Sequence, residues 1–191
     1  EQAPKWAAAL DIQPEAVLLA EESARRSGLE DVFFPVLGDL RRPKELPKPF
    51  EAGGFHLVTC NPPYKRMGSG ILSSAQSDQI ARHEAACTLE EVCAAAARLL
   101  RYGGRLCVCQ LPERLPDLLQ AMRRHNIEPK RLRFVQERAD TAPWLLLCEG
   151  KLGSKPFLQV EPPLLLREQG EDSKEYREMM GLYRKGEDPP R

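Results

Sequence analysis

The sequence lacks several features that mark particular classes of protein. It has no net charge, because 28 Lys and Arg residues balance 28 Asp and Glu residues, so the overall positive charge typical of nucleic-acid-binding chains is missing. No apolar run approaches the ~20 residues that a membrane helix needs, and no signal segment opens the chain. With 191 residues, of which 42% are hydrophobic, disorder is disfavoured. These properties predict a cytoplasmic protein with one ordinary domain and no membrane contact.

Metal-binding spacings are also missing. None of the six cysteines forms a Cys-x-x-Cys pair, and none of the three histidines lies at a ligand spacing from a cysteine cluster, so we predict no metal site. Cys60, Cys107, Cys109 and Cys148 lie in apolar, strand-like stretches, where a free thiol behaves as a small buried hydrophobe. Reduced thiols are therefore favoured over disulfides.

Predicted strands and helices alternate along the chain. We expect strands at 6–10, 32–37, 55–60, 105–110, 130–137 and 143–149, and helices at 14–27, 78–87, 89–102 and 113–125. This alternation predicts an α/β fold with a mostly parallel sheet and helices on both faces. The last two strands are joined by too few residues for a crossover, so they should pair antiparallel. Residues 169–191 are polar and predicted to form a mobile tail.

Chemically informative residues follow the first three predicted strands. In open α/β sheets, ligands bind beyond the carboxyl ends of the strands, and here those ends carry Asp11, Asp39 and Asn61. An acidic residue at such a position in a nucleotide-binding fold often accepts hydrogen bonds from ribose hydroxyls. A single acidic residue is a weak signal, because helix N-termini are also often acidic for dipole and capping reasons.

The segment Asn61-Pro62-Pro63-Tyr64 is more specific. An exocyclic amino group on adenine, or a side-chain amide nitrogen, is a poor nucleophile because its lone pair is delocalised. The Asn61 side-chain oxygen and the Pro62 carbonyl would accept its two N–H groups and direct the lone pair at an electrophilic methyl, with the prolines fixing the backbone beforehand. Tyr64 offers a ring on which a base could stack, worth ~1–3 kcal/mol. A rigid turn that ends a strand is the plainer interpretation.

The order of these features resembles that of class I S-adenosylmethionine-dependent methyltransferases that act on an amino nitrogen. The stretches NPPYKRMGSG, ARHEAACTLEEV, AARLLRYGGRL, PERLPDLL, EPKRLRFV and VEPPLLL resemble, over about residues 7–166, the bacterial enzymes that methylate N6 of adenine 37 beside the anticodon of valine tRNA. The resemblance implies a Rossmann-like methyltransferase domain over 1–168, with a mostly parallel sheet and an antiparallel C-terminal hairpin.

The resemblance also implies a set of functional residues. Asn61, Pro62, Pro63 and Tyr64 would hold the target base, and S-adenosylmethionine would be bound by Asp11, Ile12, Asp39, Leu40 and Asn61, with Asp11 at the ribose and Asp39 near the adenine. The segment Arg82-His83-Glu84 also matches a segment of the family. We interpret it as a helix surface that packs against the Asn-Pro-Pro-Tyr loop. For the tRNA partner, we expect phosphate contacts from Arg41, Arg42, Lys65 and Arg66. A later basic group, Arg123, Arg124, Lys130, Arg131 and Arg133, is equally well explained as ordinary solvated charge.

One part of the family pattern is missing. The strand and Gly-rich turn that form the first wall of the cofactor site should precede Asp11 by roughly twenty residues, but only ten residues precede it and none is glycine. We therefore expect the chain, which does not begin with Met, to be an N-terminally incomplete portion of a longer product that lacks a central strand. Alone, it should bind the cofactor weakly or not at all.

Two alternatives to the tRNA methyltransferase remain. A protein-glutamine N5-methyltransferase shares the Asn-Pro-Pro-Tyr motif, because an amide nitrogen poses the same chemical problem, although the ARHE and CTLEEV stretches disfavour it. A non-catalytic RNA-binding fragment would bind RNA in a salt-sensitive way without binding the cofactor.

Overall fold

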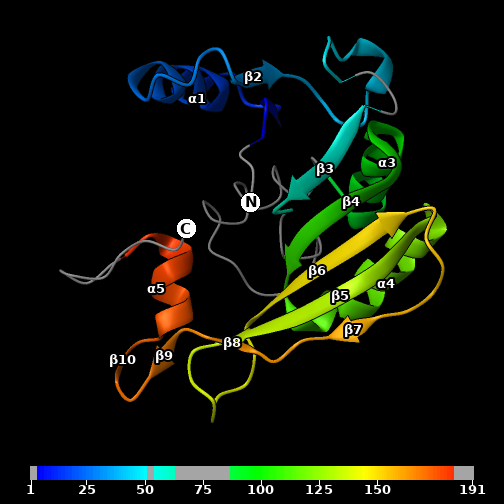
Figure 1. The fold of residues 1–191 in the computed structure, drawn as a ribbon. Helices are drawn as coiled ribbons and strands as arrows, with labels where there is room; N and C mark the ends of the chain where they lie inside the picture. Colours follow the sequence, from blue (N-terminus) through cyan, green and yellow to red (C-terminus); the bar gives the residue numbers. More distant parts are fainter. Residues whose placement is uncertain (1–3, 51–53, 63–86, 183–191) are drawn as a thin grey trace, which may run out of the picture. The chain divides into compact units, whose positions relative to one another are not determined.

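The computed structural model describes residues 4–50, 54–62 and 87–182. Within it the chain forms two compact units, Glu1–Gly54 and Phe55–Arg191, whose elements are labelled in Figure 1. The prediction of a single domain over 1–168 stays a prediction.

The first unit is a small β-α-β arrangement. Strands β1 (Ala7–Asp11) and β2 (Phe33–Leu37) pair in parallel, and α1 (Pro14–Arg26) connects them. As predicted, α1 begins at Pro14, where a missing N–H costs nothing, and ends before Gly28, whose positive φ of 64° suits a glycine after a helix. A short 3₁₀ turn, η1 (Pro43–Glu45), follows β2.

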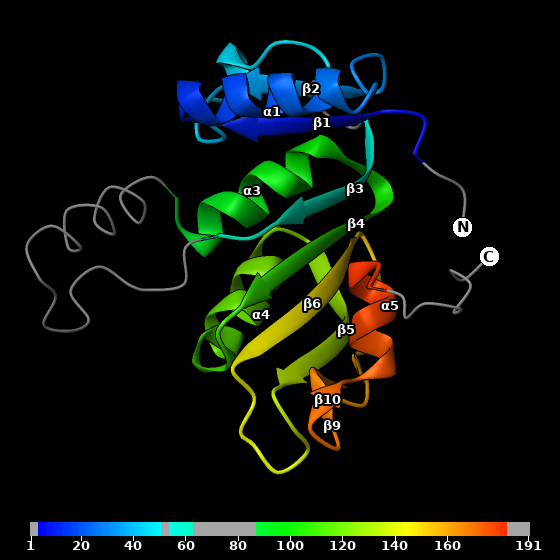
Figure 2. The same cartoon turned by 90° about the vertical axis from the view of Figure 1, so that its left-hand side faces the viewer.

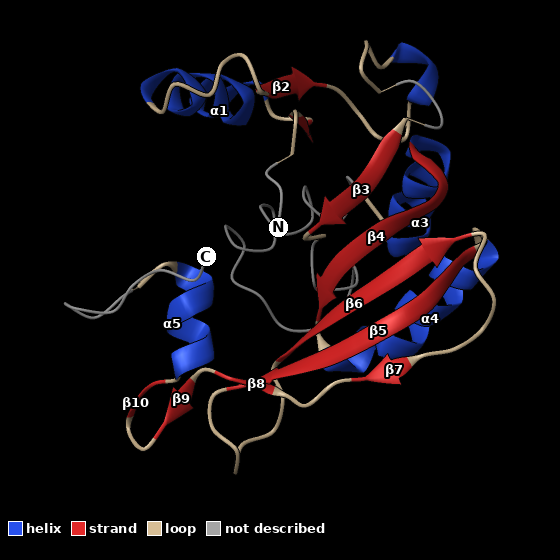
Figure 3. Ribbon diagram, viewed as in Figure 1, coloured by secondary structure: helices blue, strands red, loops and turns tan. Residues whose placement is uncertain are grey.

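The second unit is built on a mixed six-stranded sheet in the order β3-β4-β6-β5-β7, with β8 beside β5 (Figure 3). Its strands are β3 (Phe55–Cys60), β4 (Leu100–Gln110), β5 (Ile127–Gln136), β6 (Leu145–Leu152), β7 (Gln159–Val160) and β8 (Leu164–Leu165). Strands β3 and β4 are parallel, whereas β6 pairs antiparallel with both β4 and β5. The predicted antiparallel hairpin is thus confirmed.

Two helices cover one face of this sheet (Figure 2). They are α3 (Leu89–Leu99) and α4 (Leu115–Arg124), the latter preceded by the 3₁₀ turn η2 (Pro112–Arg114). Helix α3 begins with a capping box, in which the side chains of Thr88 and Glu91 each accept the other residue's backbone N–H. The core between helices and sheet includes fully buried Leu106, Leu118 and Leu146.

The boundary between α3 and β4 differs from our prediction. The sequence predicts a helix that runs to about Tyr102, but the helix ends at Leu99 and β4 begins at the next residue. Gly103 and Gly104 lie within the strand, where its pairing with β3 shifts register. A Cβ on Gly104 would lie 3.0 Å from the carbonyl oxygen of Phe55, so this glycine permits a close approach of two backbones. The predicted helix 78–87 lies almost wholly outside the described residues.

Within the segment predicted to form a tail, the described residues 169–182 include regular structure. A hairpin of β9 (Arg167–Glu168) and β10 (Glu171–Asp172) leads into helix α5 (Lys174–Met180). The Ser173 hydroxyl donates to the carbonyl oxygen of Leu165 at 2.6 Å and accepts from the N–H of Tyr176 at 3.1 Å. This serine caps α5 and ties it to β8.

Candidate functional site

Asp11 and Asp39 lie at the same edge of the β1–β2 pair. Asp11 is the last residue of β1 and pairs with Leu37, so Gly38 and Asp39 directly continue the neighbouring strand. The Gly38 N–H donates to the carbonyl oxygen of Asp11 at 2.9 Å, which holds the two strand ends together. Both acidic side chains are thus at the carboxyl edge of a parallel pair, where open α/β folds bind nucleotides.

The two carboxylates differ in the number of hydrogen bonds that they accept within the protein. Among the described residues, the Asp11 carboxylate accepts one hydrogen bond, from the Gln13 N–H to its Oδ1 at 2.8 Å, at the entrance to α1. Both oxygens of Asp39, by contrast, accept from the Arg41 guanidinium at 2.7–3.0 Å, and Oδ1 also accepts the Arg41 N–H. Hydrogen bonding by Arg41 lowers the pKa of Asp39. Ile12 is exposed and Leu40 half-buried beside them.

Asn61 occupies the corresponding position after β3 in the second unit. Its side chain is exposed, and the following Pro62 is buried. Because Cys60 pairs with Val108, the next residue along lies beside Cys109 at the end of β4, and the Cys109 Sγ donates to the Asn61 Oδ1 at 3.0 Å. Burial raises the pKa of the neighbouring Cys60 thiol to about 12, so that thiol adds no charge to the surroundings of Asn61.

Several predicted site residues lie outside the described part of the chain. These are Pro63, Tyr64, Lys65, Arg66 and the Arg82-His83-Glu84 segment. Asp11, Ile12, Asp39 and Leu40 belong to one compact unit and Asn61 and Pro62 to the other. The structure therefore brings the two acidic residues together, while their joining with Asn61 in a single site stays a prediction.

Most of the predicted basic residues that the structure describes are held by carboxylates. In the first unit, Arg41 binds Asp39, and Arg42 lies 3.6 Å from Glu45. The later group forms the pairs Arg123–Glu128, Arg124–Glu90, Arg131–Glu161 and Arg133–Glu175, and the Lys130 ammonium donates to the Lys155 carbonyl oxygen. This pairing favours the interpretation of the later group as ordinary protein charge.

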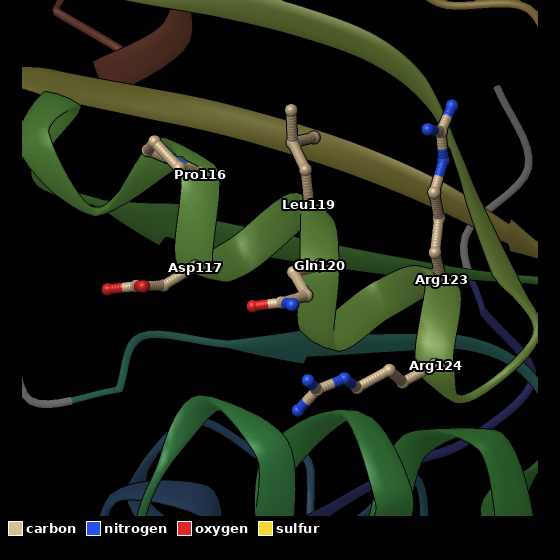
Figure 4. A pocket seen from close by; sticks show the side chains of 6 residues that line it. All are labelled: Pro116, Asp117, Leu119, Gln120, Arg123 and Arg124. Atoms are coloured by element: carbon tan, nitrogen blue, oxygen red, sulfur yellow. The ribbon is translucent and has the colours of Figure 1, made fainter.

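A shallow pocket lies on the surface of α4, and Figure 4 shows its lining. Pro116, Leu119 and Arg123 form one row of side chains, and Asp117, Gln120 and Arg124 form a second. Arg123 and Arg124 of the later basic group line it, whereas none of the described residues predicted for the cofactor or the target base does. Among the described residues, no group of three His, Cys, Asp or Glu side chains is placed to hold a metal ion. In the same part of the chain, every helix is too short or too polar to cross a membrane.

We compared the sequence and the structure with those of known proteins. No protein-family model matches the sequence, and no curated protein matches it either. Among solved structures, a predicted O-methyltransferase from Agrobacterium tumefaciens superposes with a TM-score of 0.70 at 16% identity, over 91% of this chain and 76% of its own. The chain has a Rossmann-like methyltransferase fold. A geranyl diphosphate methyltransferase solved with S-adenosylmethionine (TM-score 0.51, 13% identity, 76% and 68% covered) and the Methanococcus jannaschii fibrillarin pre-rRNA processing protein (0.52, 12%, 78% and 57%) are also similar.

Within this methyltransferase fold, sequence reasoning missed the position of Cys109. The sequence shows it only as one of several cysteines in apolar strands, yet it is half-buried and contacts Asn61. Alternation along β4 carried part of the signal, since Val108 and Gln110 are buried while Cys107 and Cys109 are only partly so. Its partner could not be identified without the register that pairs β4 with β3.

Proposed function

We propose that this chain belongs to an S-adenosylmethionine-dependent methyltransferase that modifies N6 of an adenine beside the anticodon of a tRNA. The observation that carries the proposal is the position of Asn61, exposed at the carboxyl end of a parallel strand and followed by a buried proline. A polar acceptor on a fixed backbone is what orientation of a weakly nucleophilic amino group requires.

The residues present fit the cofactor at one position and need a rearrangement at another. Among the described residues, the Asp11 carboxylate accepts only the Gln13 N–H, so it suits a ribose hydroxyl, and exposed Ile12 suits the adenosine face. Asp39 accepts an adenine amino group only after Arg41 releases it. When bound, the cofactor supplies the electrophilic methyl group. That a similar fold was solved with S-adenosylmethionine supports this assignment.

In the proposed reaction the protein orients the amino nitrogen. The Asn61 side-chain oxygen accepts one N–H of the target and the Pro62 carbonyl accepts the other, so that the nitrogen lone pair is available for attack. Tyr64 supports the base by stacking. An anticodon-loop adenine is already unpaired, so presenting it costs less than extruding a base from a duplex.

Methyl transfer from radiolabelled S-adenosylmethionine tests the proposal, with the product of the complete coding sequence as enzyme. The acceptors are a tRNA transcript with adenine beside the anticodon, the same transcript with guanine there, and a peptide release factor. We expect label only in the first, recovered as N6-methyladenosine. Label in the release factor instead would establish the glutamine methyltransferase, and salt-sensitive tRNA binding without cofactor binding would establish the non-catalytic alternative.

Substitution of Asn61 connects the activity to the proposed residue. Asn61→Ala should abolish turnover, because the interaction on which the reaction depends is made with the target base. The dissociation constant for S-adenosylmethionine, measured by calorimetry, should stay within about twofold, because the four other residues predicted at the cofactor remain. A near-normal rate for this variant would refute the assignment.

A further inference from the structure

The thiol of Cys109 contacts the amide on which the proposed reaction depends. Its Sγ lies 3.0 Å from the Asn61 Oδ1, although the two residues are 48 positions apart. The contact joins the ends of two adjacent parallel strands, β3 and β4. Both ends are therefore held by the backbone ladder of the sheet, which fixes the separation of the two side chains.

The pairing of β3 with β4 explains why a cysteine stands there. Thr59 pairs with Cys107 and Cys60 with Val108, and one further step brings Asn61 alongside Cys109. Along β4, Val108 is 3% exposed and Gln110 fully buried, so the alternate residues Cys107 and Cys109 point to the other side of the sheet. Cys109 is therefore aimed away from the core and toward the strand end that carries Asn61.

An asparagine amide needs such a partner if its oxygen is to act as a fixed acceptor. Rotation about the last side-chain bond is soft, and a half-turn exchanges the oxygen for the NH2 group. A thiol donates a hydrogen bond, and the amide oxygen has two acceptor positions. Donation from Cys109 fills one position, disfavours the flipped amide and leaves the second position for an N–H of the target.

We propose that Cys109 is a positioning residue, which holds the Asn61 amide with its oxygen as the acceptor. The proposal rests on the proposed function, since it explains how Asn61 is prepared for the amino group of its target. Cys109 itself touches neither substrate nor cofactor in this role. Loss of one ordinary hydrogen bond predicts a roughly three- to tenfold lower kcat, with little change in the KM for tRNA.

Three variants separate positioning from packing. Cys109→Ala removes the donor, Cys109→Ser retains one, and Cys107→Ala is the matched control, because Cys107 is on the same strand and face but pairs with Thr59. We expect kcat to fall for Cys109→Ala, to remain within about twofold of wild type for Cys109→Ser and to be unchanged for Cys107→Ala. Equal losses in both Cys109 variants would overturn the proposal, because the restored donor would then have no effect.

A second measurement does not depend on activity. The side-chain NH2 resonances of Asn61, assigned by their loss in Asn61→Asp, should shift and exchange faster with water in Cys109→Ala, but not in Cys107→Ala. Unchanged Asn61 resonances in Cys109→Ala would contradict the contact and with it the proposal. If the wild-type protein methylates no tRNA, the proposed function fails, whereas the resonances still decide whether Cys109 orients Asn61.

Discussion

At the scale of single residues, Asp39 shows how a predicted cofactor contact is already occupied within the protein. Its side chain is 15% exposed, and both carboxylate oxygens are held by Arg41. Two predictions from the sequence thus exclude each other in this arrangement: Asp39 as a partner of adenine and Arg41 as a partner of phosphate. The residue order Asp39-Leu40-Arg41 allows this short-range pair, since the backbone N–H of Arg41 also binds the carboxylate.

Removal of Arg41 should therefore favour the cofactor. In the wild-type protein, the adenine amino group can bind Asp39 only after the Asp39–Arg41 ion pair breaks, and a partly exposed ion pair is worth up to about 1 kcal/mol. Arg41→Ala removes this cost of binding. We expect the dissociation constant for S-adenosylmethionine to fall by up to about fivefold in calorimetry. Arg42→Ala is the matched control, because its guanidinium lies 4.0 Å from Asp39 and is mostly exposed. Weaker binding by Arg41→Ala would show that Arg41 assists the cofactor instead.

At the scale of elements, helix starts were predictable because they depend on neighbouring residues. Pro14 and the Thr88–Glu91 capping box are local signals, and both helices begin where these signals place them. The start of β4 was not predictable in the same way. Gly103 and Gly104 have the composition of a helix stop, but the close approach of Gly104 to the Phe55 backbone depends on a strand far away in the sequence.

The capping box gives a stability prediction for α3. Thr88 accepts the Glu91 N–H at 3.2 Å, and the Glu91 carboxylate accepts the Thr88 N–H at 2.7 Å. Thr88→Ala removes the side-chain cap and should lower the free energy of unfolding by about 1 kcal/mol, measured as a lower urea midpoint. Thr88→Ser keeps the hydroxyl and should remain within a few tenths of a kcal/mol of wild type. An unchanged midpoint in Thr88→Ala would show that tertiary packing alone fixes the start of the helix.

At the scale of the whole molecule, zero net charge conceals long-range pairing. Arg131 binds Glu161 and Arg133 binds Glu175, across 30 and 42 positions of sequence. Such pairs cannot be predicted from local composition, which shows only a basic cluster followed by an acidic segment. That Asp11, Asp39 and Asn61 lie at the carboxyl ends of β1, β2 and β3 was predictable, because it follows from the α/β pattern itself. The partners of Asp39 and Asn61 were not.

These ion pairs should make the fold sensitive to acid. Hydrogen bonding by arginine lowers the pKa of Asp39, Glu161 and Glu175 below their ordinary values of 3.8, 4.5 and 4.5. A carboxyl with a lowered folded pKa stabilises the fold above its unfolded pKa, and this contribution is lost as the pH falls through the folded value. We expect the urea midpoint to drop below about pH 4.5. The double variant Glu161→Gln/Glu175→Gln should show a smaller drop, and an equal drop would exclude these two groups.

The same pairing predicts which basic residues act on tRNA. Since the Arg131 guanidinium is held by Glu161 at 2.8 Å, its substitution removes little charge that phosphates could reach. Arg131→Ala should leave the KM for tRNA within about twofold. The double variant Lys65→Ala/Arg66→Ala removes two residues directly after the Asn-Pro-Pro-Tyr motif and should raise the KM roughly tenfold. It should also reduce the slope of log KM against log salt concentration by the equivalent of up to two phosphate contacts. Kinetics over a salt series measure both effects. Glu161→Ala is the control that releases Arg131: if the freed guanidinium then lowers the KM, the pair masks a phosphate-binding residue, and if it does not, Arg131 lies outside the tRNA interface.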